Sequence, residues 1–444
     1  MINIILRSPL YNKHIISSIK YLLNKGKIIN IFYEIIRFDK LSVNALSEII
    51  ELALVHKEQL NIILEPISQN KIRKFLMHFE YINQKIVFSN SVLDEGFEES
   101  LKVRGSKLPK KLSNNLFLFT IQHKILKIYF KFNKLVLEKI INYYFWKIVK
   151  RNNIKVVKND LFIFIPFIFP GSLQQILSTK FAKNLSMIGS WDNLTTKGFL
   201  YTNPKKMIIW SEFQKDELNN IHSINPYSYI CGSLSLQDSF NKYKGYIKDL
   251  NKPINKKPLI YYLGSTLSAS PTDLKALENI YNLYKNSCQI LFRPHPTLKK
   301  EFIDKIKSQC KNLEIDTSYN GGETDKYSQN TFFSNIFKSD IIFGTNTTSL
   351  LQAALFNKIV VVPSIKPFDL HKTIYHFKYI KFLIENKAII EITSFKEIEK
   401  LINSKINKDE LFKFIFNQKI DEGHFINSPA KKLSEYILRE SIKN

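Results

Sequence analysis

The sequence predicts an α/β protein with two mainly parallel sheets, one in each half of the chain. Short apolar runs alternate with amphipathic stretches long enough for helices, and this alternation is typical of βαβ units. The stretch from 238 to 258 is polar and basic with two prolines, and the alternation starts again after it. Because 444 residues exceed what one hydrophobic core comfortably supports, we expect domains at 1–240 and 258–444, joined by a linker at 241–257.

Each strand is expected where a short apolar run is bounded by polar or turn-forming residues. In the first half, these runs lie at 3–6, 27–33, 60–64, 85–88, 162–169, 186–189, 206–210 and 228–232. In the second half, strands are expected at 259–263, 289–292, 340–343 and 359–362, with helices at 273–286 and 349–356. Ligands bind at the carboxyl ends of strands in open parallel sheets, so we expect a ligand in a cleft between the two halves.

Composition excludes several classes of protein. Apolar residues make up 44% of the chain and charged residues 23%, which excludes wholesale disorder. The three cysteines form no CxxC pair and support neither a disulfide framework nor a cysteine zinc site. The most apolar run, 161–169, contains a proline and is too short to span a bilayer. Since the amino terminus also lacks a cleavage signal, we expect a cytoplasmic protein.

Positive charge is concentrated in one segment of a chain whose net charge is +26. Residues 101–158 hold fifteen Lys or Arg and a single acid, Glu138. Within this segment, 116–149 lacks Gly and Pro and predicts one or two amphipathic helices with a stripe of lysines. The stripe consists of Lys124, Lys127, Lys131 and Lys134. Lysines that flank an apolar face suit an anionic membrane surface, and an ordinary packed helix with a solvated basic face is the alternative.

The sharpest candidate motif is Arg293-Pro294-His295-Pro296, directly after the strand expected at 289–292. The prolines fix φ and stiffen the loop, so they hold the cation and the imidazole in place. A guanidinium and an imidazole N–H at the end of a strand suit a phosphate or pyrophosphate. An incidental histidine in a surface loop is the alternative.

Hydroxyl-rich loops follow two other strands of the second half. Residues 344–349 read Gly-Thr-Asn-Thr-Thr-Ser and precede an apolar helix, where hydroxyls cap the free N–H groups and can also face a phosphate. A weaker Gly-Ser-Thr triplet at 264–266 ends the first strand of this half and also suits a plain turn. The residues expected to contact a phosphorylated ligand are Gly264, Ser265, Thr347, Thr348 and Ser349.

Candidate carboxylates lie in the first half. Asp94-Glu95-Gly96 follows the strand expected at 85–88 and suits a general base or a capped turn. Asp192 lies in the block 190–198 (SWDNLTTKG), whose mixture of polar residues after a strand suits a substrate contact; a capped turn is the alternative. The sequence has no HExxH, no Walker A loop and no GxSxG elbow, and no histidine pair has metal spacing with a supporting carboxylate.

Together, these motifs resemble bacterial glycosyltransferases of the GT-B fold that build lipopolysaccharide or capsule. The sequence RPHP at 293–296 is similar to the HP motif of bacterial sialyltransferases, polysialyltransferases, capsule Kdo transferases and CDP-glycerol phosphotransferases. The sequence TNTTS at 345–349 resembles their Ser/Thr motif, and Asp94-Glu95-Gly96 is similar to the sialyltransferase motif that contains the base. Many GT-B enzymes have a glutamate for the donor ribose where this chain has Gln352.

The resemblance implies two Rossmann-like domains that face each other across a cleft, with the acceptor domain first and the nucleotide-sugar domain second. The expected reaction is an inverting, metal-independent transfer, with Asp94 or Asp192 as base and His295, Arg293 and residues 347–349 stabilising the leaving phosphate. The donor is a nucleotide sugar, with a CMP-sugar favoured, and no separate cofactor is expected. The acceptor is a membrane-linked glycan, which places the enzyme at the inner face of the cytoplasmic membrane.

Two alternatives stay open at this point. A CDP-glycerol-type polyol-phosphate transferase would share the same HP motif. A nucleic-acid-binding module would explain the net charge of +26, but no RNA- or DNA-binding signature is present and two α/β halves need another explanation. We therefore expect no nucleic-acid partner. For the base, a lysine near Asp192 would lower its pKa, which favours Asp94 as the base and Asp192 as a substrate-orienting residue.

Overall fold

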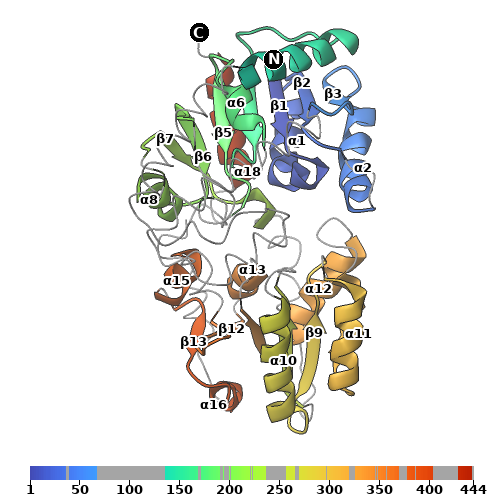
Figure 1. Ribbon diagram of the computed structural model, residues 1–444. Coiled ribbons are helices and arrows are strands. Elements are labelled where there is room, and N and C mark those ends of the chain that lie inside the picture. The colour runs from blue at the N-terminus through green and yellow to red at the C-terminus, as the bar shows by residue number, and fades with distance from the viewer. Residues whose placement is uncertain are drawn as a thin grey trace. The chain divides into compact units, whose positions relative to one another are not determined.

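The structure is a computed structural model in which two compact α/β units are described (Figure 1). The described residues are 1–36, 40–67, 136–168, 172–190, 194, 200, 202–220, 222, 224–236, 257–265, 270–296, 298–319, 326–345, 347, 349–356, 358–369, 378–385, 387–403 and 429–442. The first unit contains the described parts of 1–67, 136–236 and 429–442, and the second contains those of 257–403. Each unit is built around one parallel sheet.

The first unit contains a sheet of seven described strands in the order β3-β2-β1-β4-β5-β6-β7, all parallel. The strands are β1 (Ile2–Leu6), β2 (Ile29–Tyr33), β3 (Leu60–Ile63), β4 (Leu161–Ile165), β5 (Asn184–Met187), β6 (Lys206–Ile209) and β7 (Tyr227–Ile230). Strand order reverses at β1, which lies between β2 and β4. This reversal is the arrangement of a doubly wound Rossmann-like sheet.

Both faces of this sheet are buried at its centre, where β1, β2 and β4 are buried along their whole length. In β1, Ile4 packs into one hydrophobic cluster and Ile5 into the other, because successive side chains point to opposite faces. One face is covered by α1 (Ile16–Asn24), α2 (Lys40–Val55) and α18 (Pro429–Ile442). The other face is covered by helical residues 136–151, α6 (Gln174–Ser178) and α8 (Glu212–Asn220). A short 3-10 helix, η1 (Pro9–His14), follows β1.

The second unit contains a sheet of six described strands in the order β10-β9-β8-β11-β12-β13, again all parallel. The strands are β8 (Leu259–Leu263), β9 (Gln289–Arg293), β10 (Glu314–Ile315), β11 (Ile341–Gly344), β12 (Ile359–Pro363) and β13 (Ile390–Ile392). The helices are α10 (Ser270–Tyr284), α11 (Lys300–Gln309), α12 (Lys326–Lys338), α13 (Ser349–Leu355), α15 (Lys378–Glu385) and α16 (Glu397–Asn403). Here the order reverses at β8, between β9 and β11.

The predicted fold class, α/β with two Rossmann-like parallel sheets, is confirmed. The expected strands are present with small shifts at their ends, except that the strand expected at 85–88 lies outside the described residues. The helix expected at 273–286 begins at Ser270 and ends at Tyr284. The basic segment is helical over 136–151, whereas its four-lysine stripe, Lys124 to Lys134, lies outside the described residues. No helix in the described part of the chain combines the length and the apolar character needed to cross a bilayer.

The end of the chain belongs to the first unit, whereas the sequence analysis assigned all of 258–444 to the second domain. Helix α18 packs against α1, and Ser18 donates a hydrogen bond to the carbonyl of Ala430. The ring of Tyr436 stacks on Tyr229 of β7, with centroids 4.0 Å apart. An apolar face of α18 therefore completes the cover of the first sheet, which is why the chain returns to that unit.

We expect Tyr436→Ala to destabilise the first unit by about 3–5 kcal/mol, because it leaves a cavity between α18 and the sheet. Tyr436 is buried in the core cluster of that face. Denaturant unfolding followed by tryptophan fluorescence measures the effect, since all three tryptophans of the chain precede residue 237.

The matched control is Tyr227→Ala, which removes a tyrosine that is 59% exposed on β7. We expect this variant to differ from the wild type by about 0.5 kcal/mol or less. Equal losses in the two variants would contradict the anchoring role of α18.

Candidate functional site

Three motif-bearing loops of the second unit leave the sheet at the same level. Leu263 at the end of β8 pairs with Arg293 of β9 on one side and with Gly344 of β11 on the other. The residues after these three positions therefore emerge side by side at the carboxyl edge, where the strand order reverses. In doubly wound sheets, the carboxyl edge at this reversal is where ligands bind.

A buried carboxylate, Asp273 in the first turn of α10, ties two of these loops together. Its Oδ2 accepts the backbone N–H of Ser265 at 2.7 Å, and its Oδ1 accepts the hydroxyls of Thr345 at 2.8 Å and Tyr262 at 2.7 Å. The hydroxyl of Ser265 lies 2.7 Å from that of Thr345. Because Thr345 donates to Asp273, Ser265 donates to Thr345. The ends of β8 and β11 are thus joined to the start of α10.

The pKa of Asp273 reflects opposing influences. Burial raises it above its ordinary value, and the hydrogen bonds from Ser265, Tyr262 and Thr345 offset part of that rise. These groups act as donors toward the carboxyl oxygens, so the carboxylate form is the one that satisfies the network. Ser265 and Thr345 are buried, and their hydroxyls are engaged by this network. The sequence suggested Ser265 as a phosphate contact. In the structure, its hydroxyl belongs to the hydrogen-bond network that holds the loops after β8 and β11 together.

At Gly264, the loop that bears the HP motif passes very close to the backbone. The N–H of Gly264 donates to the carbonyl of Arg293 at 2.9 Å. A Cβ added at Gly264 would lie 3.0 Å from that carbonyl oxygen and 3.3 Å from the backbone nitrogen of His295. Any larger residue would push the two loops apart, so Gly264 acts by permitting this close approach.

The guanidinium of Arg293 is engaged by neighbouring protein groups. Its Nη1 forms an ion pair with Asp316 at 2.6 Å and donates to the hydroxyl of Ser318 at 2.7 Å. Its Nη2 donates to Ser328 at 3.1 Å, and the group lies over the ring of Phe332. The expected contact of Arg293 with a donor phosphate stays a prediction. In the structure, Arg293 locks β9 to α12 and so fixes the start of the HP loop.

Asp316, just after β10, is the second buried carboxylate of the site. It accepts hydrogen bonds from Tyr261 at 2.6 Å and from the side chain of Asn335 at 3.2 Å, in addition to the pair with Arg293. Burial by itself raises the pKa of Asp316, but the charge of Arg293 and the donated hydrogen bonds outweigh it, so the pKa lies below its ordinary value of 3.8. The ion pair is therefore fully charged at neutral pH.

Among the described residues, the predicted site residues with partly exposed side chains are Arg293, His295, Thr347, Ser349 and Gln352. The carbonyl of His295 accepts the N–H of Leu298 at 2.8 Å, which closes the turn after the HP motif. The Thr347 hydroxyl lies 3.4 Å from the N–H of Ser349 and caps α13, as its position before the helix predicts. Because they are partly exposed, these side chains can meet a ligand at this edge.

Three predicted site residues, Asp94, Asp192 and Thr348, lie outside the described residues. Two described residues, Leu194 in the block that contains Asp192 and Leu200 just after that block, contact His222. His222 lies with Nε2 2.8 Å from the carbonyl of Leu194 and Nδ1 3.4 Å from the N–H of Leu200. Burial lowers the pKa of His222 to about 4, so the ring is neutral and can donate to one partner while it accepts from the other.

Asp273 and Asp316 are not among the site residues predicted from the sequence, although a signal for both is present. Tyr261 and Tyr262 are adjacent in a strand that is apolar on both faces. A buried tyrosine hydroxyl normally finds a hydrogen-bond partner, so this pair indicated an acceptor on each side of the sheet. Which acids supply these acceptors depends on the packing of α10 and of the loop after β10. No group of three His, Cys, Asp or Glu among the described residues is arranged to hold a metal ion.

The first unit has a comparable buried pair at the carboxyl edge of its sheet. Arg7, after β1, forms an ion pair with Glu34, after β2. Glu34 also accepts the hydroxyl of Ser172 at 3.0 Å and the N–H of Leu173 at 3.2 Å. Burial raises the pKa of Glu34, although Arg7 and these donors act in the opposite direction. This pair joins three loops of the first unit, and the sequence analysis did not single it out.

Comparison with known proteins shows similarity in structure. No protein-family model matches the sequence, and no curated protein matches it. Arabidopsis thaliana UGT89C1 complexed with UDP is similar with a TM-score of 0.50, at 12% identity over 99% of both chains. UDP-GlcNAc 2-epimerase from Neisseria meningitidis bound to UDP-GlcNAc has a TM-score of 0.46, at 10% identity over 99% of both chains. A glycosyltransferase from Rickettsia africae has a TM-score of 0.46, at 12% identity over 100% of this chain and 99% of its own. The likeness to UGT89C1 shows that the chain has the GT-B fold.

We expect the Asp316 ion pair to make the second unit sensitive to acid. Because the folded pKa of Asp316 is lowered, its contribution to stability is fully present above the unfolded pKa of about 4 and is lost as pH falls through the folded pKa. Asp316→Asn should cost about 3–5 kcal/mol at neutral pH, since it leaves Arg293 buried without its partner.

Thermal unfolding of both proteins between neutral pH and about pH 2 measures this effect, and the difference between them cancels groups that they share. The difference in melting temperature between the wild type and Asp316→Asn should be largest at neutral pH and should become smaller in acid. If this difference in melting temperature does not change with pH, the stabilisation by Asp316 does not depend on its negative charge.

Proposed function

We propose that the chain is a glycosyltransferase that moves a sugar from a nucleotide sugar to a hydroxyl group of a surface glycan, such as lipopolysaccharide or capsule. The observation that carries this proposal is the register of three loops at the carboxyl edge of the second sheet. This register sets the HP loop and the Ser/Thr loop on either side of Gly264. A shared edge of this kind suits one elongated, phosphorylated ligand.

The donor phosphate would lie against the side chains at this edge that are partly exposed. His295 follows β9 and Thr347 follows β11, and these strands flank β8. The two loops are therefore about two strand spacings, or roughly 10 Å, apart, a span that a nucleotide sugar can bridge. His295 would donate to the leaving phosphate as its negative charge grows, and the hydroxyls of Thr347 and Ser349 would do the same. The buried Asp273 and Asp316 networks hold these loops in position before the ligand binds.

The reaction is a single displacement. The acceptor oxygen forms a bond to the anomeric carbon while the bond from that carbon to the phosphate oxygen breaks, and the electron pair leaves with the nucleotide. Configuration at the anomeric carbon is therefore inverted. A carboxylate takes the proton of the acceptor hydroxyl. We assign this role to Asp94, by its resemblance to the sialyltransferase motif, and an acceptor-orienting role to Asp192.

The resemblance of the HP loop to CMP- and CDP-dependent transferases favours a CMP-sugar as donor. UDP- and GDP-sugars are the competing donors, and the choice among them is a matter of the contacts made to the base. A panel of CMP, CDP, UDP and GDP in thermal unfolding separates these donors, because a nucleotide that binds the folded state raises the melting temperature. The glycan acceptor carries a sugar hydroxyl as its reacting group, and a membrane-linked chain would present it at the bilayer surface.

We expect His295→Ala to lower kcat by about a hundred- to a thousandfold, because the variant loses one donor to the charge that develops on the leaving phosphate. Release of nucleotide from the preferred donor, with an acceptor present, is the measurement. His56→Ala, a histidine substitution in the first unit, is the matched control and should keep normal turnover.

Two outcomes would contradict this assignment. Normal turnover in His295→Ala would show that His295 of the HP motif does not act at the donor site. If oligonucleotides stabilise the wild type and none of the mononucleotides does, the chain is a nucleic-acid-binding protein and not a transferase. Mass analysis of the product gives a third reading, since an acceptor that gains phosphate along with the transferred group indicates polyol-phosphate transfer.

We expect Asp94→Asn to lower kcat by about a hundredfold or more with donor affinity intact, because asparagine keeps the shape and removes the basicity. Asp192→Asn should mainly raise the KM for the acceptor. Steady-state kinetics with each substrate varied in turn distinguishes the two effects. Exchanged phenotypes would reverse the two roles, and normal turnover in both variants would exclude both residues as the base.

A further inference from the structure

The helical residues 136–151 have one face that the core of the first unit does not use. Their inner face packs into the hydrophobic cluster against the sheet. The residues of this inner face are Leu137, Ile141, Phe145, Ile148 and Val149. The spacing of three and four between them accounts for the buried stripe of an amphipathic helix. The outer face carries the described side chains of this helix that are exposed.

Apolar side chains are exposed along this outer face. Val136 is 50% exposed, Ile140 37% and Tyr143 62%. They recur at intervals of four and three residues, so they lie along one stripe of the helix. Isolated apolar residues on a surface need no explanation, but a stripe of them on one helix points to a contact surface.

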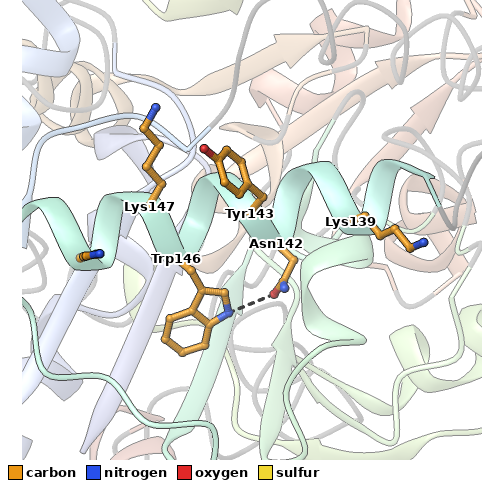
Figure 2. A pocket seen from close by; sticks show the side chains of 6 residues that line it. Lys139, Asn142, Tyr143, Trp146 and Lys147 are labelled. Carbon is orange, nitrogen blue, oxygen red and sulfur yellow. Dashed lines mark hydrogen bonds between the residues drawn. The ribbon is translucent and has the colours of Figure 1, made fainter.

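The charged side chains that the helix itself contributes to this face are all basic, and one of them, Arg151, pairs with Glu65 at 3.1 Å. Lys139, Lys147 and Lys150 are exposed there, and Figure 2 shows Lys147 and Tyr143 projecting from the same side of the helix. The one acid in this stretch, Glu138, is buried, and it pairs with Lys180 at 2.6 Å and accepts the hydroxyl of Thr179 at 3.2 Å. No carboxylate of residues 136–151 therefore offsets the three lysines.

A hollow on this surface is lined by four of the same side chains, Lys139, Tyr143, Lys147 and Lys150, and by Trp146 and Asn142 (Figure 2). The indole N–H of Trp146 donates to the side-chain oxygen of Asn142 at 3.1 Å. The ring is partly buried against the core cluster, near Phe145 and Phe181, and its polar edge is satisfied within the helix. Tyrosine and tryptophan with this arrangement are typical of membrane interfaces.

We propose that the outer face of residues 136–151 docks on an anionic lipid bilayer. The helix lies parallel to the surface, its lysines meet lipid phosphates, and Val136, Ile140 and Tyr143 enter the layer between headgroups and acyl chains. Charge complementarity supports this occupant, and the apolar stripe favours a bilayer over a soluble polyanion, which would leave that stripe in water. This proposal depends on the helix surface alone and not on the proposed function.

The experiment is sedimentation of the full chain with vesicles of phosphatidylglycerol and phosphatidylcholine, and with phosphatidylcholine alone as reference. A first variant carries Lys139→Gln, Lys147→Gln and Lys150→Gln. A second variant carries Val136→Ser and Tyr143→Ser. The matched control replaces three exposed lysines of α11 by glutamine, on a helix with no exposed large apolar side chain in its described surface. These lysines are Lys300, Lys305 and Lys307.

The wild type should bind the anionic vesicles, and the first variant should bind about a hundredfold more weakly, given the usual contribution of each lysine near an anionic surface. The second variant should also bind more weakly, while the α11 variant should bind as the wild type does. Equal losses in the α11 variant would show that only net charge matters and would overturn the proposal. Wild-type binding that survives both substitutions of the helix would overturn it as well.

A soluble polyanion gives the decisive comparison. If dextran sulfate binds as tightly as the vesicles and the Val136 and Tyr143 substitutions have no effect on either, the face binds polyanionic glycan and the bilayer proposal is wrong. Nucleotide stabilisation of each variant, measured in parallel, should be unchanged. This readout separates failure at the helix surface from failure of the proposed donor site.

Discussion

The buried carboxylate of Asp273 is the constraint on which the candidate site depends. It accepts hydrogen bonds from groups on β8, on the loop after β8 and on the loop after β11. An ionised group in this position is tolerated only while its donors stay in place, so burial converts three separate hydrogen bonds into one cooperative unit. Asp316 acts in the same way for β9, β10 and α12 through Arg293. Loops that would otherwise vary in position are thereby held at one level of the sheet.

These networks separate the residues that build the site from those that can meet a ligand. Ser265, Thr345 and Arg293 have their polar groups engaged by other protein groups. His295 and Thr347 belong to the same motifs, yet their side chains are partly exposed. A motif read along the chain mixes both kinds of residue, because neighbours in sequence on a loop alternate between supporting it and facing outward. Preorganised groups of this kind are what a transferase needs, since they stabilise charge without rearrangement during the reaction.

In the first unit, different helices cover the two faces of the sheet, and one of these helices also presents an exposed basic face. Helix α18 lies on one face and residues 136–151 on the other. The helix at 136–151 supplies large apolar side chains to the core, including Phe145, and this packing fixes which face is left outward. The lysines of the outward face need no partner inside the protein, so the same helix can stabilise the fold and present a basic surface.

Local patterns in the sequence predicted the described strands other than β10 and β13, both parallel sheets and the loops that bear the HP and Ser/Thr motifs, because apolar runs and turn residues act within a few positions of each other. The partners of Arg293 and Asp273 were not predictable in this way. Arg293 meets Asp316 across 23 positions and Asp273 meets Thr345 across 72, and α18 returns to a unit that the chain had left. Such pairs depend on strand order and on which faces of each sheet still need cover. Periodicity does not encode either of these, so only the tertiary structure decided that Arg293 supports its loop through Asp316 and that the last helix completes the first sheet.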